Sequence, residues 1–503
     1  MSSNKLIVKN TLMLYIRMLC SVCINLYSSR ILLERLGIDD FGIYNIVGGI
    51  VAMLAFLNTT MSGCTSRFLT YELGKGDTAK LKTIFSSALQ IHILIAIAVL
   101  LIGESIGLWF VNTQLTIPES KMTAINFVYQ FSLISALFSF IQVPYMSDVI
   151  AHERMGVYAF IELLHVSLKL CAAFLIAYLS IERLISYSAT LSIVSLIIFL
   201  LYRTYSKRFF EETEFNFVLN KGVLISMFKF IGWDFYGNAC VIVQQQGTNI
   251  LINRFFGVAL NAATGIATQA SSAVSMFVSS FTMALRPPII KKYASSEFCE
   301  LQKMLGLSIV VCMFLVEIVC LPLYLRIDKI MSLWLIDVPP FAVSFCKWML
   351  LANSVNVMNT LFTALIHATG NIKRLSFISG TIYLLTVVFS YFAFRNSFAP
   401  TTAYVILFLL TIIVLINNAL IVKRQIPKLS FRRLITDATI PCVSLFIAII
   451  SVLYINKLLN DTIGGILLLF VLNAIVACSS LYLLWAMPKY GWNLKRLIKQ
   501  NDF

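Results

Sequence analysis

The residues of this sequence that can do chemistry in an apolar setting are ionisable side chains that interrupt long hydrophobic runs. Such side chains are costly in hydrocarbon and usually face a protein interior or a water-filled cavity. Arg17 interrupts the first run, and Glu162, His165 and Lys169 interrupt the fifth at positions i, i+3 and i+7. This spacing places those three on one face of a helix. The other embedded candidates are Lys229 and Asp234 in the seventh run and Lys347 in the tenth.

The bases of this set predict an anionic, phosphorylated ligand. Arg17, Lys169, Lys229 and Lys347 carry fixed positive charge within the runs, and Arg30 and Arg254 lie at the outer ends of the first and seventh. A cavity lined with these bases would attract phosphate groups and repel lipophilic cations. The acidic and titratable candidates for ion coupling are Glu162, His165 and Asp234.

Each candidate also has a structural interpretation. Arg30 and Arg254 can extend to the outer interface, and Lys229 can reach the inner one. Glu162 and Lys169 can form a pair within one helix, bridged by His165. Arg17 is harder to explain in this way because a fixed charge well inside a run requires a partner or water.

The elements that must position these residues are membrane-spanning helices. The 503 residues are 59% hydrophobic and 12% charged, and the mean hydropathy is +0.87. A spanning helix needs about 20 mostly apolar residues, and runs of that length recur along the chain. The sequence predicts an all-α polytopic membrane protein with about 14 spans: 8–30, 40–61, 84–111, 122–147, 156–180, 184–202, 223–250, 257–283, 304–325, 340–367, 375–395, 400–422, 438–456 and 463–486.

Most of the 39 lysines and arginines lie in every second connection between these spans. Basic loops stay in the cytoplasm, so this pattern predicts that both termini are cytoplasmic. The basic loops also explain the net charge of +16, because they set the topology and contact anionic membrane lipids. Nucleic acid is therefore not an expected partner. The longest loop on the opposite side is expected at about 326–339, and the glycines of the seventh span are expected to let it bend.

A weak internal repeat predicts the domain organisation. Arg35 and Arg67 bracket the second span, and Arg254 and Arg286 bracket the eighth with the same spacing. The expected arrangement is two six-helix lobes as parallel repeats, followed by two further helices. We place these parts at 1–208, 209–433 and 434–503.

No motif in the sequence indicates an enzyme. A Walker A motif and a G-x-S-x-G elbow are missing. The four histidines are widely spread, so no metal site is predicted, and the scattered cysteines predict no disulfide framework. No cofactor is expected.

The first helical hairpin carries a recognisable motif. It ends the first span with Ser29-Arg30 and opens the second with Leu36-Gly37, followed by Phe41-Gly42-Ile43-Tyr44. Arg67-Phe68 and Gly74-Lys75-Gly76-Asp77 follow. This pattern resembles the polysaccharide-transporter branch of the multidrug/oligosaccharidyl-lipid/polysaccharide (MOP) exporter superfamily, which includes the O-antigen flippases.

The resemblance implies a MATE-like, V-shaped fold with a central cavity and alternating access. It implies a flippase, not an enzyme, which moves an undecaprenyl-diphosphate-linked oligosaccharide to the outer leaflet of a bacterial inner membrane. The glycan would serve O-antigen, capsule or exopolysaccharide biosynthesis together with polymerase and export machinery. A proton or sodium gradient would drive transport, and Arg17, Arg30 and Arg254 are the positions that best match basic cavity residues.

Two other functions remain open at this point. One is a multidrug or cation antiporter of the same superfamily, although the first span of this chain lacks an acidic residue. The other is a membrane glycan polymerase, although no sizeable external loop with arginines or histidines is expected.

Overall fold

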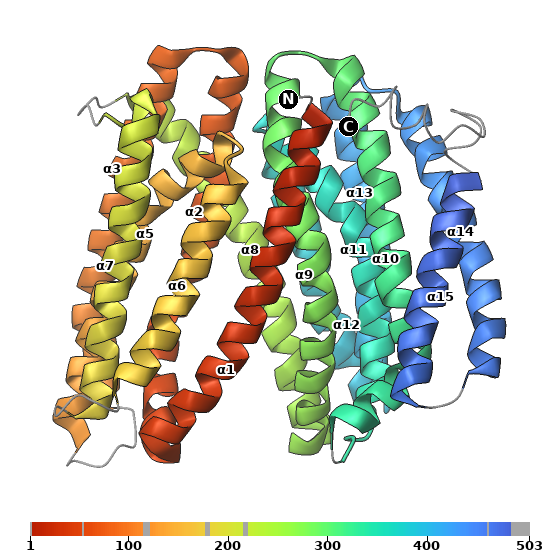
Figure 1. The fold of residues 1–503 in the computed structure, drawn as a ribbon, viewed down its shortest axis with the longest axis horizontal. Helices are drawn as coiled ribbons and strands as arrows, with labels where there is room; N and C mark the ends of the chain where they lie inside the picture. Colours follow the sequence, from red (N-terminus) through yellow and green to blue (C-terminus); the bar gives the residue numbers. More distant parts are fainter. Residues whose placement is uncertain are drawn as a thin grey trace. The chain divides into compact units, whose positions relative to one another are not determined.

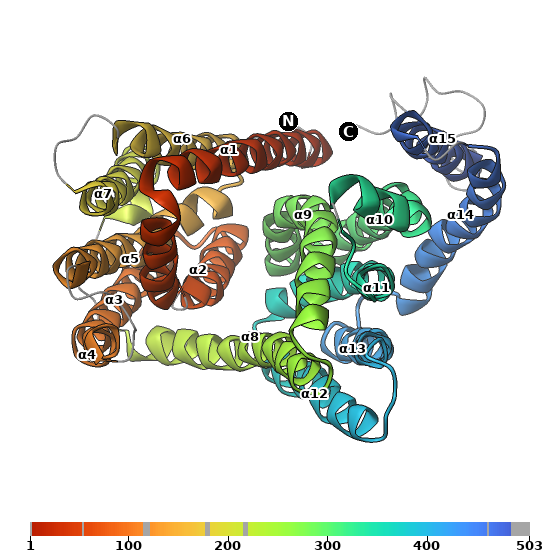
Figure 2. The ribbon, with the colours of Figure 1, turned by 90° about the horizontal axis from the view of Figure 1, so that it is seen from below.

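The computed structural model of the protein describes residues 3–52, 55–113, 121–176, 182–214, 220–335, 337–459 and 462–483. These residues form helices joined by short connections (Figures 1 and 2). The chain divides into two compact units, which are described separately. The N-terminal unit is Lys9–Gly232, and the C-terminal unit combines Met1–Val8 with Trp233–Phe503.

The N-terminal unit is built around α5, which contains Pro144. Helix α5 packs along α7 and against α2 and α3 (Figure 1). Asp77 caps the start of α3 by accepting a hydrogen bond from the Lys80 amide at 3.0 Å, as expected for an N-cap aspartate. The elements of this unit are α1 (Ser3–Ala52), α2 (Ala55–Lys75), α3 (Thr78–Ile102), η1 (Gly103–Gly107), α4 (Leu108–Thr113), α5 (Met122–Ala151), α6 (Met155–Leu175), α7 (Arg183–Phe209), η4 (Glu211–Thr213) and the first part of α8 (Lys221–Phe256).

The C-terminal unit is organised around α11, which packs against α9, α10 and α13. Helix α11 ends at Gly370, whose φ of 80° is the left-handed conformation that glycine adopts readily. Helices α14 and α15 both pack on α10 (Figure 2). The elements of this unit are the rest of α8, α9 (Val258–Ala294), α10 (Phe298–Trp334), α11 (Ala342–Thr369), η5 (Leu375–Ser379), α12 (Gly380–Arg395), α13 (Thr402–Gln425), α14 (Phe431–Leu458) and α15 (Ile463–Leu481).

Buried amides and hydroxyls join the helices of the C-terminal unit. Asn418 donates to the Asn359 side chain at 3.2 Å and accepts from the Ser379 hydroxyl at 2.8 Å. Asn359 donates in turn to the Thr411 carbonyl at 3.3 Å. These bonds connect α11, η5 and α13. They contribute to packing because lipid leaves no hydrophobic driving force between membrane helices.

Twelve helical segments of the described chain are long and apolar enough to cross a membrane. Each coincides with one of the predicted spans, which confirms the all-α polytopic class. The predicted span 40–61 runs from α1 into α2 and includes residues outside the described ranges. The predicted span 223–250 lies within α8, which is one helix across Gly232, Gly237 and Gly247.

Two predicted connections differ from the structure. Residues 31–39, expected to join the first two spans, are helical and belong to α1. The expected outer loop at 326–339 is also shorter, because α10 continues to Trp334. Arg326 therefore lies inside α10, at a position with non-helical backbone angles (φ −116°, ψ 16°). It is 5% exposed.

Arg326 fastens the end of α14 to α10. Its guanidinium donates to the Asn456 side chain, to the Asn456 carbonyl at 2.9 Å and to the Leu459 carbonyl at 3.0 Å. These bonds satisfy carbonyls in the last turn of a helix, where partners within the helix are missing.

We expect Arg326→Ala to destabilise the α10–α14 contact by about 1–3 kcal/mol, the typical cost of leaving buried polar groups unpaired. Thermal unfolding of the detergent-solubilised protein should show a lower Tm, and hydrogen exchange should rise at the end of α14. Arg395→Ala, at an exposed arginine that ends α12, is the control. An equal effect of both substitutions would contradict this role.

Candidate functional site

Arg17 lies inside the first candidate span and is held by an aromatic residue. Its Nη1 donates to the Tyr158 hydroxyl at 3.1 Å, and its guanidinium lies 5.1 Å from the centre of the Tyr158 ring. The Arg17 Nε is buried and has no hydrogen-bond partner among the described residues. An arginine has five N–H donors, so this guanidinium retains unused donor capacity.

Glu162 lies one turn beyond Tyr158 on α6. Its carboxylate accepts a hydrogen bond at 3.1 Å from Tyr202 of α7, which is fully buried. The charges of Arg17 and Lys169 both act on this carboxylate. Helices α1, α6 and α7 thus bring two bases and one carboxylate together in the N-terminal unit. We call Arg17, Tyr158, Glu162, Lys169 and Tyr202 the α6 cluster.

The α6 cluster differs from the simple intrahelical pair that the sequence left open. Glu162 is hydrogen-bonded to Tyr202, and Lys169 acts on it only through its charge. His165 lies between them on the same helix, and like them it is half-buried. The cluster offers one buried donor without a partner among the described residues, the Arg17 Nε, and Glu162 and His165 are its titratable neighbours on α6.

The described side chains among the other predicted bases lie on α8 and α11. Lys229 and Arg254 are exposed on α8. Lys347, on α11, lies 5.6 Å from the centre of the Tyr324 ring. The Arg30 side chain lies outside the described part of the structure.

Asp234, the third predicted coupling residue, has partners in the C-terminal unit. Its carboxylate lies 3.6 Å from Nε2 of His367 on α11 and accepts from Asn238 at 3.3 Å. Arg286 of α9 acts on it electrostatically. Asp234 is 14% exposed and His367 17% exposed at the side chain, so this acid and imidazole form a partly buried pair suited to binding a proton or a small cation.

A polar pocket of about 340 Å³ lies in the same unit. Its lining contains no lysine, arginine, aspartate or glutamate. It consists of amides, hydroxyls and a few apolar contacts, and includes two of the glutamines of α8. Among the residues that line it are Gln244, Gln245, Asn249, Asn353, Asn356 and Tyr383.

The sequence did not predict the partners of the candidate residues. Tyr158, Tyr202 and His367 are ordinary membrane-helix residues by pattern, and only packing brings them to Arg17, Glu162 and Asp234. His92, in the third predicted span, is buried. Its Nε2 lies 3.1 Å from the Thr65 hydroxyl and its Nδ1 3.0 Å from the Phe140 carbonyl.

Comparison with known proteins places the fold. No family model matches the sequence, and no curated protein matches it. Solved structures do match. A MATE in the bent conformation has a TM-score of 0.74 at 11% identity and covers 84% of this chain and 96% of its own.

Two further matches come from the same group. An outward-facing multidrug resistance MATE family transporter of the MOP superfamily has a TM-score of 0.72 at 13% identity, covering 85% of this chain and 96% of its own. A MOP superfamily transporter from Pyrococcus furiosus has a TM-score of 0.71 at 10% identity, covering 84% and 96%. This chain therefore has the fold of the MATE transporters of the MOP superfamily.

Proposed function

We propose that this protein is a flippase for a lipid-linked oligosaccharide carried on undecaprenyl diphosphate. It moves the glycan from the cytoplasmic to the outer leaflet of a bacterial plasma membrane by alternating access, with both termini in the cytoplasm. The observation that carries the proposal is the α6 cluster. Arg17 has a buried Nε without a hydrogen-bond partner among the described residues, within a candidate membrane span, and its charge and that of Lys169 both act on the Glu162 carboxylate.

The physical problem of such a substrate is its diphosphate. Phosphates cannot cross about 30 Å of hydrocarbon without replacement of their hydration. Arginine suits this task because its planar, always charged guanidinium presents several donors to phosphate oxygens. The polyprenyl tail is apolar and can stay in lipid while the headgroup crosses. Binding must be weak enough in both states for release.

The lining of the neutral pocket in the C-terminal unit is chemically suited to sugars. Sugar hydroxyls are donors and acceptors, and Asn, Gln, Ser, Thr and Tyr side chains offer both functions. The pocket provides them from α8, α9, α11, α12 and α13. An uncharged lining would bind neutral sugars without competing for the phosphates.

A multidrug or cation antiporter is the second candidate, and the fold supports it equally. The observation in its favour is the pair of embedded carboxylates, Glu162 and Asp234, which a lipophilic cation or a coupling ion requires. One structure with this fold is described as having a reverse polarity of the binding pocket that suggests a different function of that MOP superfamily transporter. Pocket charge is therefore the property to test.

The two candidates separate in proteoliposomes that contain only the purified protein. The flippase proposal predicts that a labelled lipid-linked oligosaccharide becomes accessible on the opposite leaflet, and that lipophilic cations neither move nor compete. Transport of cationic drugs without glycan flipping would replace the proposal with the antiporter. Imposed proton and sodium gradients in the same vesicles identify the coupling ion.

Gln245 provides a test of the glycan pocket. Loss of one neutral hydrogen bond costs about 0.5–1.5 kcal/mol, so Gln245→Ala should weaken binding of the oligosaccharide-linked substrate by about two- to tenfold. Binding of bare undecaprenyl diphosphate should not change. The adjacent Gln246→Ala is the matched control, because Gln246 does not line the pocket. Equal losses for both lipids would exclude this glycan contact.

A further inference from the structure

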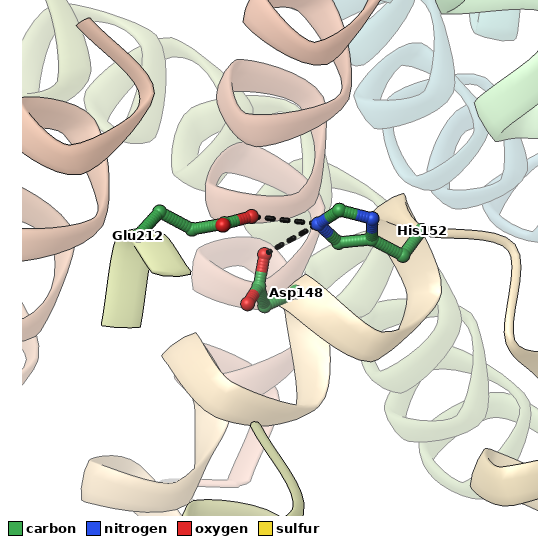
Figure 3. A group of neighbouring side chains, drawn as sticks. All are labelled: Asp148, His152 and Glu212. Carbon is green, nitrogen blue, oxygen red and sulfur yellow. Dashed lines mark hydrogen bonds and ion pairs between the residues drawn. The ribbon is translucent and has the colours of Figure 1, made fainter. Parts of the chain in front are cut away.

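Three metal-ligating side chains converge where α5 ends in the N-terminal unit (Figure 3). Nε2 of His152 lies 2.6 Å from Oε1 of Glu212 and 3.9 Å from Oδ1 of Asp148. The three donor atoms lie within 4.8 Å of one another. The sequence predicted no metal site because its four histidines are widely spread. Glu212 on η4 is 60 residues from His152, and packing joins them.

Asp148 is a buried carboxylate that no lysine or arginine of the described residues pairs with. Its side chain is 0% exposed, no N–H group of the described residues donates to either carboxylate oxygen, and its hydrogen-bonding neighbour is the Glu212 carboxyl. A buried carboxylate without compensation is strongly unfavourable. Glu212 brings a second carboxylate, so the group holds two acids and one imidazole.

The cations near this group are engaged elsewhere. Lys82 pairs with Glu214 at 3.6 Å. Arg154 donates to the Tyr205 hydroxyl at 3.1 Å and lies over the rings of two neighbouring phenylalanines. No described lysine or arginine forms an ion pair with Asp148 or Glu212.

Glu212 lies on η4, just after α7 ends.

The spacing fits a tetrahedral ion with small movements. Zinc binds imidazole nitrogen at about 2.0–2.1 Å and carboxylate oxygen at about 2.0–2.2 Å, which puts tetrahedral ligands roughly 3.3 Å apart. The observed 2.6 and 3.9 Å from His152 lie on either side of this value, so these two ligand pairs must shift by less than about 1 Å. The Asp148 and Glu212 oxygens lie within 4.8 Å of each other, so that pair must shift by less than about 1.5 Å. Phe210 stacks on the His152 ring at 4.1 Å between ring centres and fixes its orientation.

We propose that Asp148, His152 and Glu212 bind a divalent transition metal ion, with Zn²⁺ as the first candidate. An imidazole beside two carboxylates suits Zn²⁺ better than Mg²⁺ or Ca²⁺, which prefer oxygen ligands alone. His152 is 26% exposed at its side chain, which leaves a side open for water as the fourth ligand. The ion would tie the end of α5 to η4.

The test measures Zn²⁺ binding to the full-length protein in detergent after treatment with a chelator. Competition with a chromophoric chelator gives the affinity, and thermal unfolding gives the stabilisation. Glu212→Gln is the informative variant, because its amide oxygen can still accept the His152 hydrogen bond while the negative charge is lost. Glu211→Gln, at the exposed neighbour on the same η4 turn, is the matched control.

We expect wild type and Glu211→Gln to bind one Zn²⁺, with a Tm increase of about 5 °C at saturating metal. Glu212→Gln should bind Zn²⁺ about 100-fold more weakly. If this variant folds poorly, His152→Gln takes its place in the test, and the same loss of affinity is expected. No Zn²⁺ binding by wild type, or equal binding by wild type and Glu212→Gln, would overturn the proposal. This readout does not depend on transport, so it stands or falls separately from the flippase.

Discussion

Replacing Arg17 with alanine is expected to lower the rate of lipid-linked glycan flipping by about 10–100-fold at subsaturating substrate. Hydrogen bonds to charged groups contribute about 1.5–3 kcal/mol, and Arg17 has donor capacity that Tyr158 does not use. Arg17→Lys should retain part of the activity, since lysine keeps the charge but loses the planar fork of donors. The rates are measured with purified variants in proteoliposomes.

Lys9→Ala is the control for the Arg17 variants, because Lys9 is an exposed base on the same helix and belongs to the topology signal. It should flip at nearly the wild-type rate. The thermal stability of each variant shows whether it folds. A folded Arg17→Ala protein with wild-type flipping would remove Arg17 from the substrate site.

The second large effect is expected at Asp234. Asparagine has almost the same shape as aspartate but cannot ionise. Asp234→Asn therefore removes the charge interaction with His367. We expect downhill flipping to persist while gradient-driven accumulation disappears. One coupled monovalent cation supplies about 2.3 kcal/mol per 100 mV, which corresponds to an accumulation of about 50-fold. Asp234→Asn should lose about 50-fold of substrate accumulation for each ion coupled at this site.

The measurement compares accumulation with and without an imposed proton or sodium gradient. Glu104→Gln is the control, because Glu104 is an exposed acid that accepts from Gln130 in the N-terminal unit. It should accumulate substrate like wild type. Full gradient dependence in Asp234→Asn would assign coupling elsewhere, with Glu162 and His165 as the remaining predicted candidates.

The helical spans were predictable because hydropathy and charge are local properties of the chain. Twelve predicted spans meet the length and composition of a membrane helix. The failures occur where a local rule is overridden. Arg326 was placed in a loop because arginine is costly in an apolar run, but carbonyls near the end of α14 satisfy it inside α10.

The candidate site was predictable only in part, because its contacts depend on packing and not only on local properties of the chain. Sequence patterns identified Arg17, Glu162 and Asp234 as charges that topology does not explain. They could not identify Tyr202 or His367, because helix packing determines those contacts. The Asp148, His152 and Glu212 group went unpredicted because the histidines are widely spread in the sequence and packing brings Glu212 to His152.

The central claim is that this chain carries a lipid-linked glycan across the membrane. It is tested most directly by leaflet-resolved labelling of that glycan in cells depleted of the protein. Undecaprenyl-diphosphate-linked oligosaccharide is expected to accumulate on the cytoplasmic leaflet, and its outer-leaflet pool is expected to fall. Accumulation of unpolymerised units on the outer leaflet would contradict it, because the flipping step would then be intact.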